Sequence, residues 1–277
     1  MDNPSDLFAR LSLTGLIQFQ YVSSELVVKC WARTLGGCSN IQSREHYLSQ
    51  SLWEGDTITV KGLWEEERTI GLGSLTAKNL CRKHNEILSP LDSEAKKIFH
   101  IIGELYRLQD VRLKLKPKKF WTVKRYRVSG RLFERWAAKF IVGCFYVLGK
   151  NKHWHLTQTG PLEPPPQISE AIFGHQQFKK PMGLYLAYDV GDRHYYDDGV
   201  KLAPLFHPDD HGLVGGNLEF KGFRFLLWLA GDDLKAFNVP TPEGRIFGPD
   251  GSKLMYHPGH ARFSISKILS QVLTLEW

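Results

Sequence analysis

The spacing of apolar side chains predicts a chain that mixes helices and strands. Residues 93–109 place apolar side chains at 98, 101, 102, 105 and 108, which is the spacing of one helix face, and Ser93 can cap that helix. Residues 129–148 are apolar almost throughout and predict a buried helix. With the shorter runs, the pattern predicts helices over 5–14, 93–109 and 129–148, and strands within 16–31 and over 57–61 and 68–72.

The pattern changes after the Pro-rich stretch at 160–166, which we interpret as a linker. Beyond it, short apolar runs are separated by Gly and Asp, which predicts an antiparallel sheet. The runs are 183–190, 200–206, 213–220 and 223–230, and residues 263–275 form a last strand or a helix. We therefore expect an α+β protein with three regions: residues 1–110, a basic helical middle at 111–160, and a β-rich C-terminal domain at 161–277.

Composition and charge narrow the class of function. The 277-residue chain is 42% hydrophobic and 23% charged, which is normal for a soluble globular protein. Its net charge of +7 is compatible with a nucleic-acid partner, although a slightly basic protein without such a partner has the same charge. The N-terminus lacks the apolar core of a signal peptide, and no apolar stretch is long enough to cross a membrane. We expect a cytoplasmic protein with no membrane partner.

Three of the four cysteines lie in the first third of the chain, where they suggest a metal site. Cys81 and His84 have the two-residue spacing typical of one half of a tetrahedral zinc site. The segment between Cys30 and Cys38 contains two adjacent glycines, so it can fold back to supply the other half. The alternative is three unrelated buried cysteines and an exposed histidine. Cys144 lies in the apolar part of the predicted helix and is expected to be a core residue.

A second group of polar residues lies between and directly after the predicted zinc ligands. Glu45 and His46 come between the two ligand pairs, and Asn85 follows the last ligand directly. Carboxylate and amide oxygens suit Mg²⁺, and a histidine side chain can take a proton from water near neutral pH. A hard cation opposite a general base is the arrangement that hydrolyses a phosphodiester. Taken singly, Glu45 and His46 also fit a solvated turn, and Asn85 fits a helix cap.

The order of these residues resembles the HNH, or ββα-metal, nucleases. In that family a cysteine pair precedes an acidic residue and a His, and a second ligand pair is followed at once by Asn. The similarity is strongest to the branch with a structural zinc, which includes phage Holliday-junction resolvases. The segment LCRKHNEILSPLD at 80–92 also resembles a segment of many bacterial HNH-like proteins. The resemblance covers residues 26–95, and it differs from the family in the seven residues between the first two cysteines and in the histidine at the fourth ligand position.

The resemblance implies a role for each of these residues. Structural zinc would be held by four side chains, catalytic Mg²⁺ or Mn²⁺ by two, and one histidine would be the general base. The zinc ligands are Cys30, Cys38, Cys81 and His84, the catalytic metal ligands are Glu45 and Asn85, and the base is His46.

A dense basic run at 112–139 directly follows this frame and suggests a nucleic-acid surface. It holds eleven Lys and Arg residues with aromatic residues among them, so the cations could neutralise phosphates while the rings stack on bases. The alternative is a solvated strand with alternating charges. The residues predicted to contact nucleic acid are Lys116, Lys118, Lys119, Lys124, Arg125 and Arg127.

The sequence therefore predicts a metal-dependent endonuclease, with DNA favoured over RNA as its substrate. Two alternatives remain at this stage: a zinc-stabilised protein that binds nucleic acid without cleaving it, and a subunit that binds a protein partner through its C-terminal domain.

Overall fold

The computed structural model describes residues 29–53, 55–61, 66–114, 124–148, 154, 163–188, 199–207, 211–220, 222–231, 253–264 and 270–277. Three α-helices lie in these residues: α2 (Arg82–Lys114), α3 (Gly130–Leu148) and α4 (Pro166–Phe173). Short 3₁₀ turns occupy η1 (Arg33–Leu35), η2 (Gln50–Leu52) and η3 (Leu72–Ser74). Within the described part of the chain, no helix is both long and apolar enough to cross a membrane.

The strands form one large sheet and two small ones. The seven-stranded sheet has the order β10-β6-β9-β8-β7-β2-β3, a three-stranded sheet has the order β11-β12-β5, and β1 pairs with β4. The strands are β1 (Glu45–His46), β2 (Thr57–Lys61), β3 (Arg68–Gly71), β4 (Thr76–Ala77), β5 (Arg125–Ser129), β6 (Gly183–Tyr188), β7 (Val200–Phe206), β8 (Leu213–Phe220), β9 (Phe223–Trp228), β10 (Lys253–Tyr256), β11 (His260–Ser264) and β12 (Ser270–Glu276).

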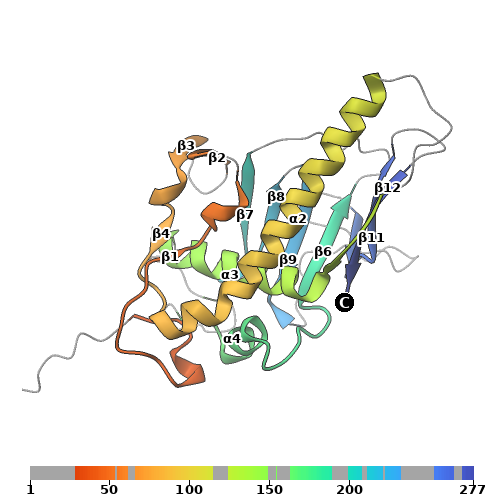
Figure 1. Cartoon of the computed structure of the whole chain (residues 1–277). Helices are drawn as coiled ribbons and strands as arrows, with labels where there is room; N and C mark the ends of the chain where they lie inside the picture. The colour runs from red at the N-terminus through yellow and green to blue at the C-terminus, as the bar shows by residue number, and fades with distance from the viewer. Residues whose placement is uncertain are drawn as a thin grey trace, which may run out of the picture.

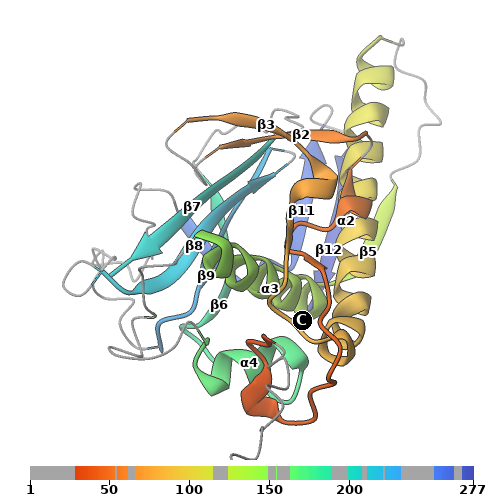
Figure 2. The same cartoon turned by 90° about the vertical axis from the view of Figure 1, so that its left-hand side faces the viewer.

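Helix α3 lies at the centre of the molecule. Figure 2 shows it between the curved seven-stranded sheet on one side and a layer of α2, β11, β12 and β5 on the other. Its aromatic face is fully buried: Trp136 stacks on Phe133 and on Phe140, with ring centroids 5.6 and 5.7 Å apart. Phe99 of α2 and Phe220 of β8 complete this cluster and stack at 4.9 Å. The rings bury large apolar areas, so they supply much of the driving force for folding around α3.

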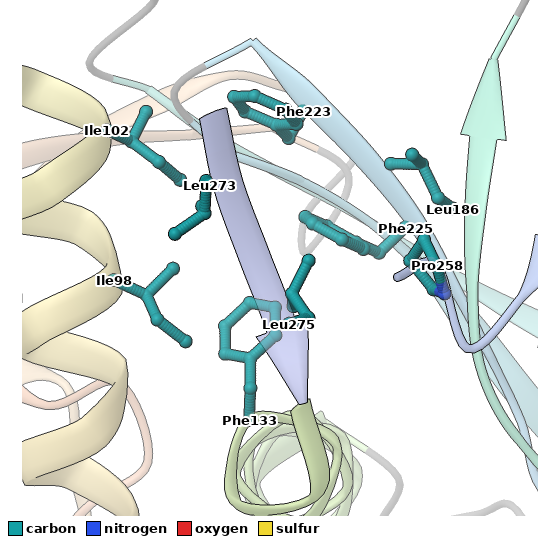
Figure 3. A pocket seen from close by; sticks show the side chains of 9 residues that line it. All are labelled: Ile98, Ile102, Phe133, Leu186, Phe223, Phe225, Pro258, Leu273 and Leu275. Carbon is teal, nitrogen blue, oxygen red and sulfur yellow. The ribbon is translucent and has the colours of Figure 1, made fainter. Parts of the chain in front are cut away.

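A small apolar cavity remains where the layers meet. Ile98 and Ile102 of α2, Phe133 of α3, and Leu273 and Leu275 of β12 all line it, and Figure 3 shows their side chains facing one another. The lining is apolar throughout. The cavity is therefore a gap in hydrocarbon packing, because it offers no polar partner to a ligand.

The predicted C-terminal sheet is present: β6 pairs antiparallel with β9, β9 with β8, and β8 with β7. The sequence did not predict that β2 of the N-terminal region would extend this sheet, pairing parallel with β7 through Val60 and Val200. One hydrophobic core runs from Cys30 to Leu275. The large sheet thus joins residues from both sides of the predicted boundaries at 110 and 161.

The long helix α2 begins eleven residues before the expected cap at Ser93 and continues through Pro90 (Figure 1). Ser93 lies inside the helix, and its hydroxyl donates to the carbonyl of Ser89. Leu88 and Leu91 are fully buried beside the proline. Their packing favours a continuous helix despite the missing backbone hydrogen bond at Pro90. The predicted helix at 129–148 is confirmed as α3.

A buried carboxylate holds the C-terminal strands against α3. Glu134 accepts hydrogen bonds from the backbone N–H of Leu184 at 2.8 Å and lies 2.7 Å from Nε2 of His257. The His257 ring is stacked between Tyr256 and Trp277, with centroids 3.8 and 3.9 Å away. These contacts tie α3, β6 and the C-terminal residues into one unit.

Candidate metal centre

Cys30, Cys38, Cys81 and His84 come together in one cluster that could hold a metal ion. Their ligand atoms all lie within 4.8 Å of one another, although the residues come from two segments far apart in the sequence. Nδ1 of His84 lies 3.2 Å from the sulfur of Cys30, 3.6 Å from that of Cys38 and 3.4 Å from that of Cys81. The predicted ligand set is therefore brought together as expected.

The spacing of these atoms suits zinc. With Zn–S bonds of about 2.3 Å and a Zn–N bond of about 2.0–2.1 Å, the edge of a tetrahedron between S and N is about 3.5 Å. The three measured distances from His84 to the sulfurs cluster around this value. Three thiolates and one imidazole are also the chemical types that structural zinc prefers. The site is compatible with structural zinc.

Local backbone features bring each ligand to the cluster. After Cys30 the chain makes the turn η1, and Gly36 and Gly37 then adopt left-handed conformations with φ of 73° and 67°. These angles are strained for residues with a side chain, so the glycine pair permits the return to Cys38. Cys81 directly precedes α2, and His84 lies in its first turn. That geometry puts both side chains of the second pair on the same end of the helix.

Hydrogen bonds join the two halves of the centre. The Gln42 side chain donates to the carbonyls of Leu80 and Lys29, at 2.7 and 3.0 Å, and accepts from the N–H of Lys29 at 2.8 Å. The backbone N–H of Trp31 donates to Asn79, and that of Ser43 donates to Leu80. These hydrogen bonds hold the first ligand loop against the residues leading into α2.

Donors around the sulfurs favour a thiolate at Cys81. Burial opposes ionisation, but hydrogen bonds from the backbone of His84 and from the backbone and hydroxyl of Ser39 outweigh it, so the pKa of Cys81 is lowered. Burial raises the pKa of Cys30 to about 12 and also raises that of Cys38. Without a cation, the cluster disfavours three neighbouring negative charges; a bound metal would reverse this.

His84 is prepared to bind as a neutral ring. Burial, followed by the charge of Lys83, lowers its pKa, while a hydrogen bond to the Gly36 backbone acts in the opposite direction. Phe173 of α4 packs edge-on against the ring, with centroids 5.2 Å apart, and also against Trp31 at 5.7 Å. Helix α4 therefore shields the centre from one side. Cys144 is buried apart from the cluster, as predicted.

The residues predicted to act in catalysis lie in β1 and in the first turn of α2. Glu45 and His46 form β1, which is antiparallel to β4, with Glu45 buried and His46 half-buried. Asn85 donates from Nδ2 to the hydroxyl of Ser43 at 2.7 Å, so α2 contacts the segment just before β1. Among the described residues, no hydrogen bond or ion pair joins Glu45, His46 and Asn85 to one another.

Glu45 has a partner that the sequence did not predict. Nζ of Lys139 on α3 lies 2.6 Å from the Glu45 carboxylate and 2.7 Å from that of Asp92 on α2. Lys139 was counted among the cations of the basic run, but only 3% of its side chain is exposed. The sequence does indicate that Lys139 is buried, because it lies within the apolar run WAAKFIVGCF. A lysine surrounded by core residues needs an acidic partner.

The predicted nucleic-acid residues are described only in part. Lys116, Lys118 and Lys119 lie outside the described residues. Arg125 is exposed on β5, Lys124 pairs with Glu104 at 2.6 Å, and Arg127 lies 3.6 Å from Glu276. The last two cations are thus shared with carboxylates of the chain itself. Their role toward nucleic acid stays a prediction.

Comparisons with known proteins identify no relative. No protein-family model matches the chain, and no match was found among curated proteins or solved structures.

Proposed function

We propose that this chain is a zinc-stabilised, metal-dependent endonuclease that hydrolyses phosphodiester bonds in DNA. The observation that carries the proposal is the contact between Asn85 and Ser43, made beside the four-ligand cluster. Through it the start of α2 meets the segment that carries Glu45 and His46. The antiparallel pair of β1 and β4 before α2 supports the proposal, although β2 and β3 lie between them in the chain and belong to the seven-stranded sheet.

The donor types fit a hard cation in part. Because Asn85 donates through Nδ2 to Ser43, its Oδ1 is the atom left to accept a cation. The Glu45 carboxylate supplies the second oxygen ligand, and it is shared with Lys139. When bound, Mg²⁺ or Mn²⁺ supplies positive charge to the leaving oxygen of the phosphodiester.

His46 acts as the base in this proposal. His46 is half-buried in β1, so water can reach part of its side chain. It takes a proton from a water molecule, whose oxygen then attacks phosphorus while the opposite P–O bond breaks.

A second candidate is a zinc-stabilised module that binds nucleic acid without cleaving it. The ion pair between Glu45 and Lys139 favours this candidate, because it occupies a carboxylate that catalysis would use. The cluster would then serve only to fix the fold.

Nicking of supercoiled plasmid DNA in Mg²⁺ or Mn²⁺ separates the two. We expect the wild type to nick the plasmid and His46→Ala to lower the rate by about 100- to 10,000-fold, the usual contribution of a general base. His100→Ala is the matched control, since His100 is an exposed histidine on α2, and it should cleave like the wild type. DNA binding without nicking by the wild type would favour the second candidate. Equal nicking by His46→Ala would remove His46 from the mechanism.

A further inference from the structure

A largely buried cluster contains two acidic side chains, Glu45 and Asp92, and one basic side chain, Lys139. The side chains of Lys139 and Glu45 are 3% and 5% exposed, and that of Asp92 is 25% exposed. They come from α3, β1 and α2, respectively. Two carboxylates thus face a single ammonium group.

One carboxylate is enough to neutralise Lys139, so the second is in surplus. A buried ion pair recovers the cost of desolvation only through close pairing and hydrogen bonds, and a second carboxylate adds a further cost. Oδ1 of Asp92 is buried without a hydrogen-bond partner. Two carboxylates on one ammonium group, and an Asp92 oxygen without a hydrogen-bond partner, leave negative charge in the cluster that Lys139 alone does not compensate.

This surplus lies next to the proposed catalytic centre. Glu45 follows Ser43 by two residues, so their backbones are within about 7 Å of each other. Ser43 in turn accepts a hydrogen bond from Asn85. A divalent cation at Asn85 would therefore find the surplus carboxylate on the neighbouring segment.

We propose that Lys139 and a divalent cation compete for the Glu45 carboxylate, and that Asp92 sets the balance. This inference rests on the proposed function. When Glu45 turns to the cation, Asp92 stays paired with the buried ammonium group. Glu45 can therefore leave Lys139 without leaving a buried charge unpaired. Lys139 and Asp92 are positioning residues of the centre, since they act through Glu45.

The test is Mn²⁺ affinity of the zinc-loaded full chain, measured from the electron paramagnetic resonance of free Mn²⁺. Asp92→Asn leaves Lys139 dependent on Glu45 alone and should weaken Mn²⁺ binding on the order of tenfold, within the range of typical coupled sites. Glu94→Gln is the control, because it removes a carboxylate from the same helix two residues away, and it should bind Mn²⁺ like the wild type. In a Glu45→Gln background, Asp92→Asn should add no further loss.

The outcomes distinguish this inference from the function on which it rests. If Asn85→Ala weakens Mn²⁺ binding but Asp92→Asn does not, the competition is wrong and the metal site stands. If the wild type binds no Mn²⁺, both are wrong. Should Asp92→Asn fail to fold, Lys139→Gln tests the opposite direction. It frees Glu45 and should bind Mn²⁺ more tightly than the wild type, and unchanged or weaker binding would overturn the proposal.

Discussion

Removing the metal from the four-ligand cluster is expected to unfold the protein. Binding of structural zinc contributes about 10–16 kcal/mol in small zinc-binding peptides, whereas a whole domain is stable by about 5–15 kcal/mol. Cys30 and Trp31 belong to the main hydrophobic core. Loss of the packing around them should therefore destabilise the whole fold and not only the metal centre. We expect a strong chelator or Cys81→Ser to abolish the cooperative thermal unfolding transition. Near-ultraviolet circular dichroism as a function of temperature measures that transition.

Cys144→Ser is the matched control for Cys81→Ser. Both changes replace a buried thiol by a hydroxyl, but Cys144 lies outside the cluster. It should cost about 1–3 kcal/mol, as expected for a buried polar group without a partner, and should retain one zinc per chain. A Cys81→Ser protein that unfolds with the same midpoint as Cys144→Ser would contradict a structural role for the metal.

Lys139→Met is expected to destabilise the fold by about 3–5 kcal/mol, because it leaves the buried Glu45 carboxylate and the half-buried Asp92 carboxylate without their cation. Replacing all three partners, as in Glu45→Gln, Asp92→Asn and Lys139→Met together, should recover part of that loss, since no buried charge is then left unpaired. Denaturant unfolding of the single and triple variants measures the difference. A triple variant less stable than Lys139→Met would contradict the charge argument.

The same cluster predicts how this contribution depends on pH. Burial alone would lower the pKa of Lys139, but the charges of Glu45 and Asp92 outweigh it and raise the pKa above the ordinary 10.5. A raised pKa means that the folded state holds this proton more tightly than the unfolded state. The stabilisation is therefore complete below pH 10.5 and is lost as the pH rises through the folded-state value. The advantage of the wild type over Lys139→Met should shrink above that pH.

Features that depend on short sequence patterns were predictable from the sequence. The apolar run at 129–148 predicted α3, and the strands near 57–61 and 213–220 were predicted from β-forming residues between turns. The metal ligands were predictable because their spacing and the Gly36–Gly37 pair are local signals that the fold retains.

Features that depend on distant segments were not predictable. The pairing of Val60 with Val200 has no local signature, because a strand does not reveal which edge it will join. The early start of α2 depends on packing that outweighs the effect of Pro90. The burial of Lys139 could be predicted from the apolar residues around it in the sequence. Its partners could not, because Glu45 and Asp92 reach Lys139 only through tertiary contacts.

We expect the three sulfurs and the one nitrogen of the four-ligand cluster to bind a single zinc ion. Zinc K-edge X-ray absorption of the purified full chain measures that shell directly. We predict three sulfur neighbours at about 2.3 Å and one nitrogen at about 2.0–2.1 Å. A shell of oxygen and nitrogen alone, or one with fewer than three sulfurs, would contradict the account.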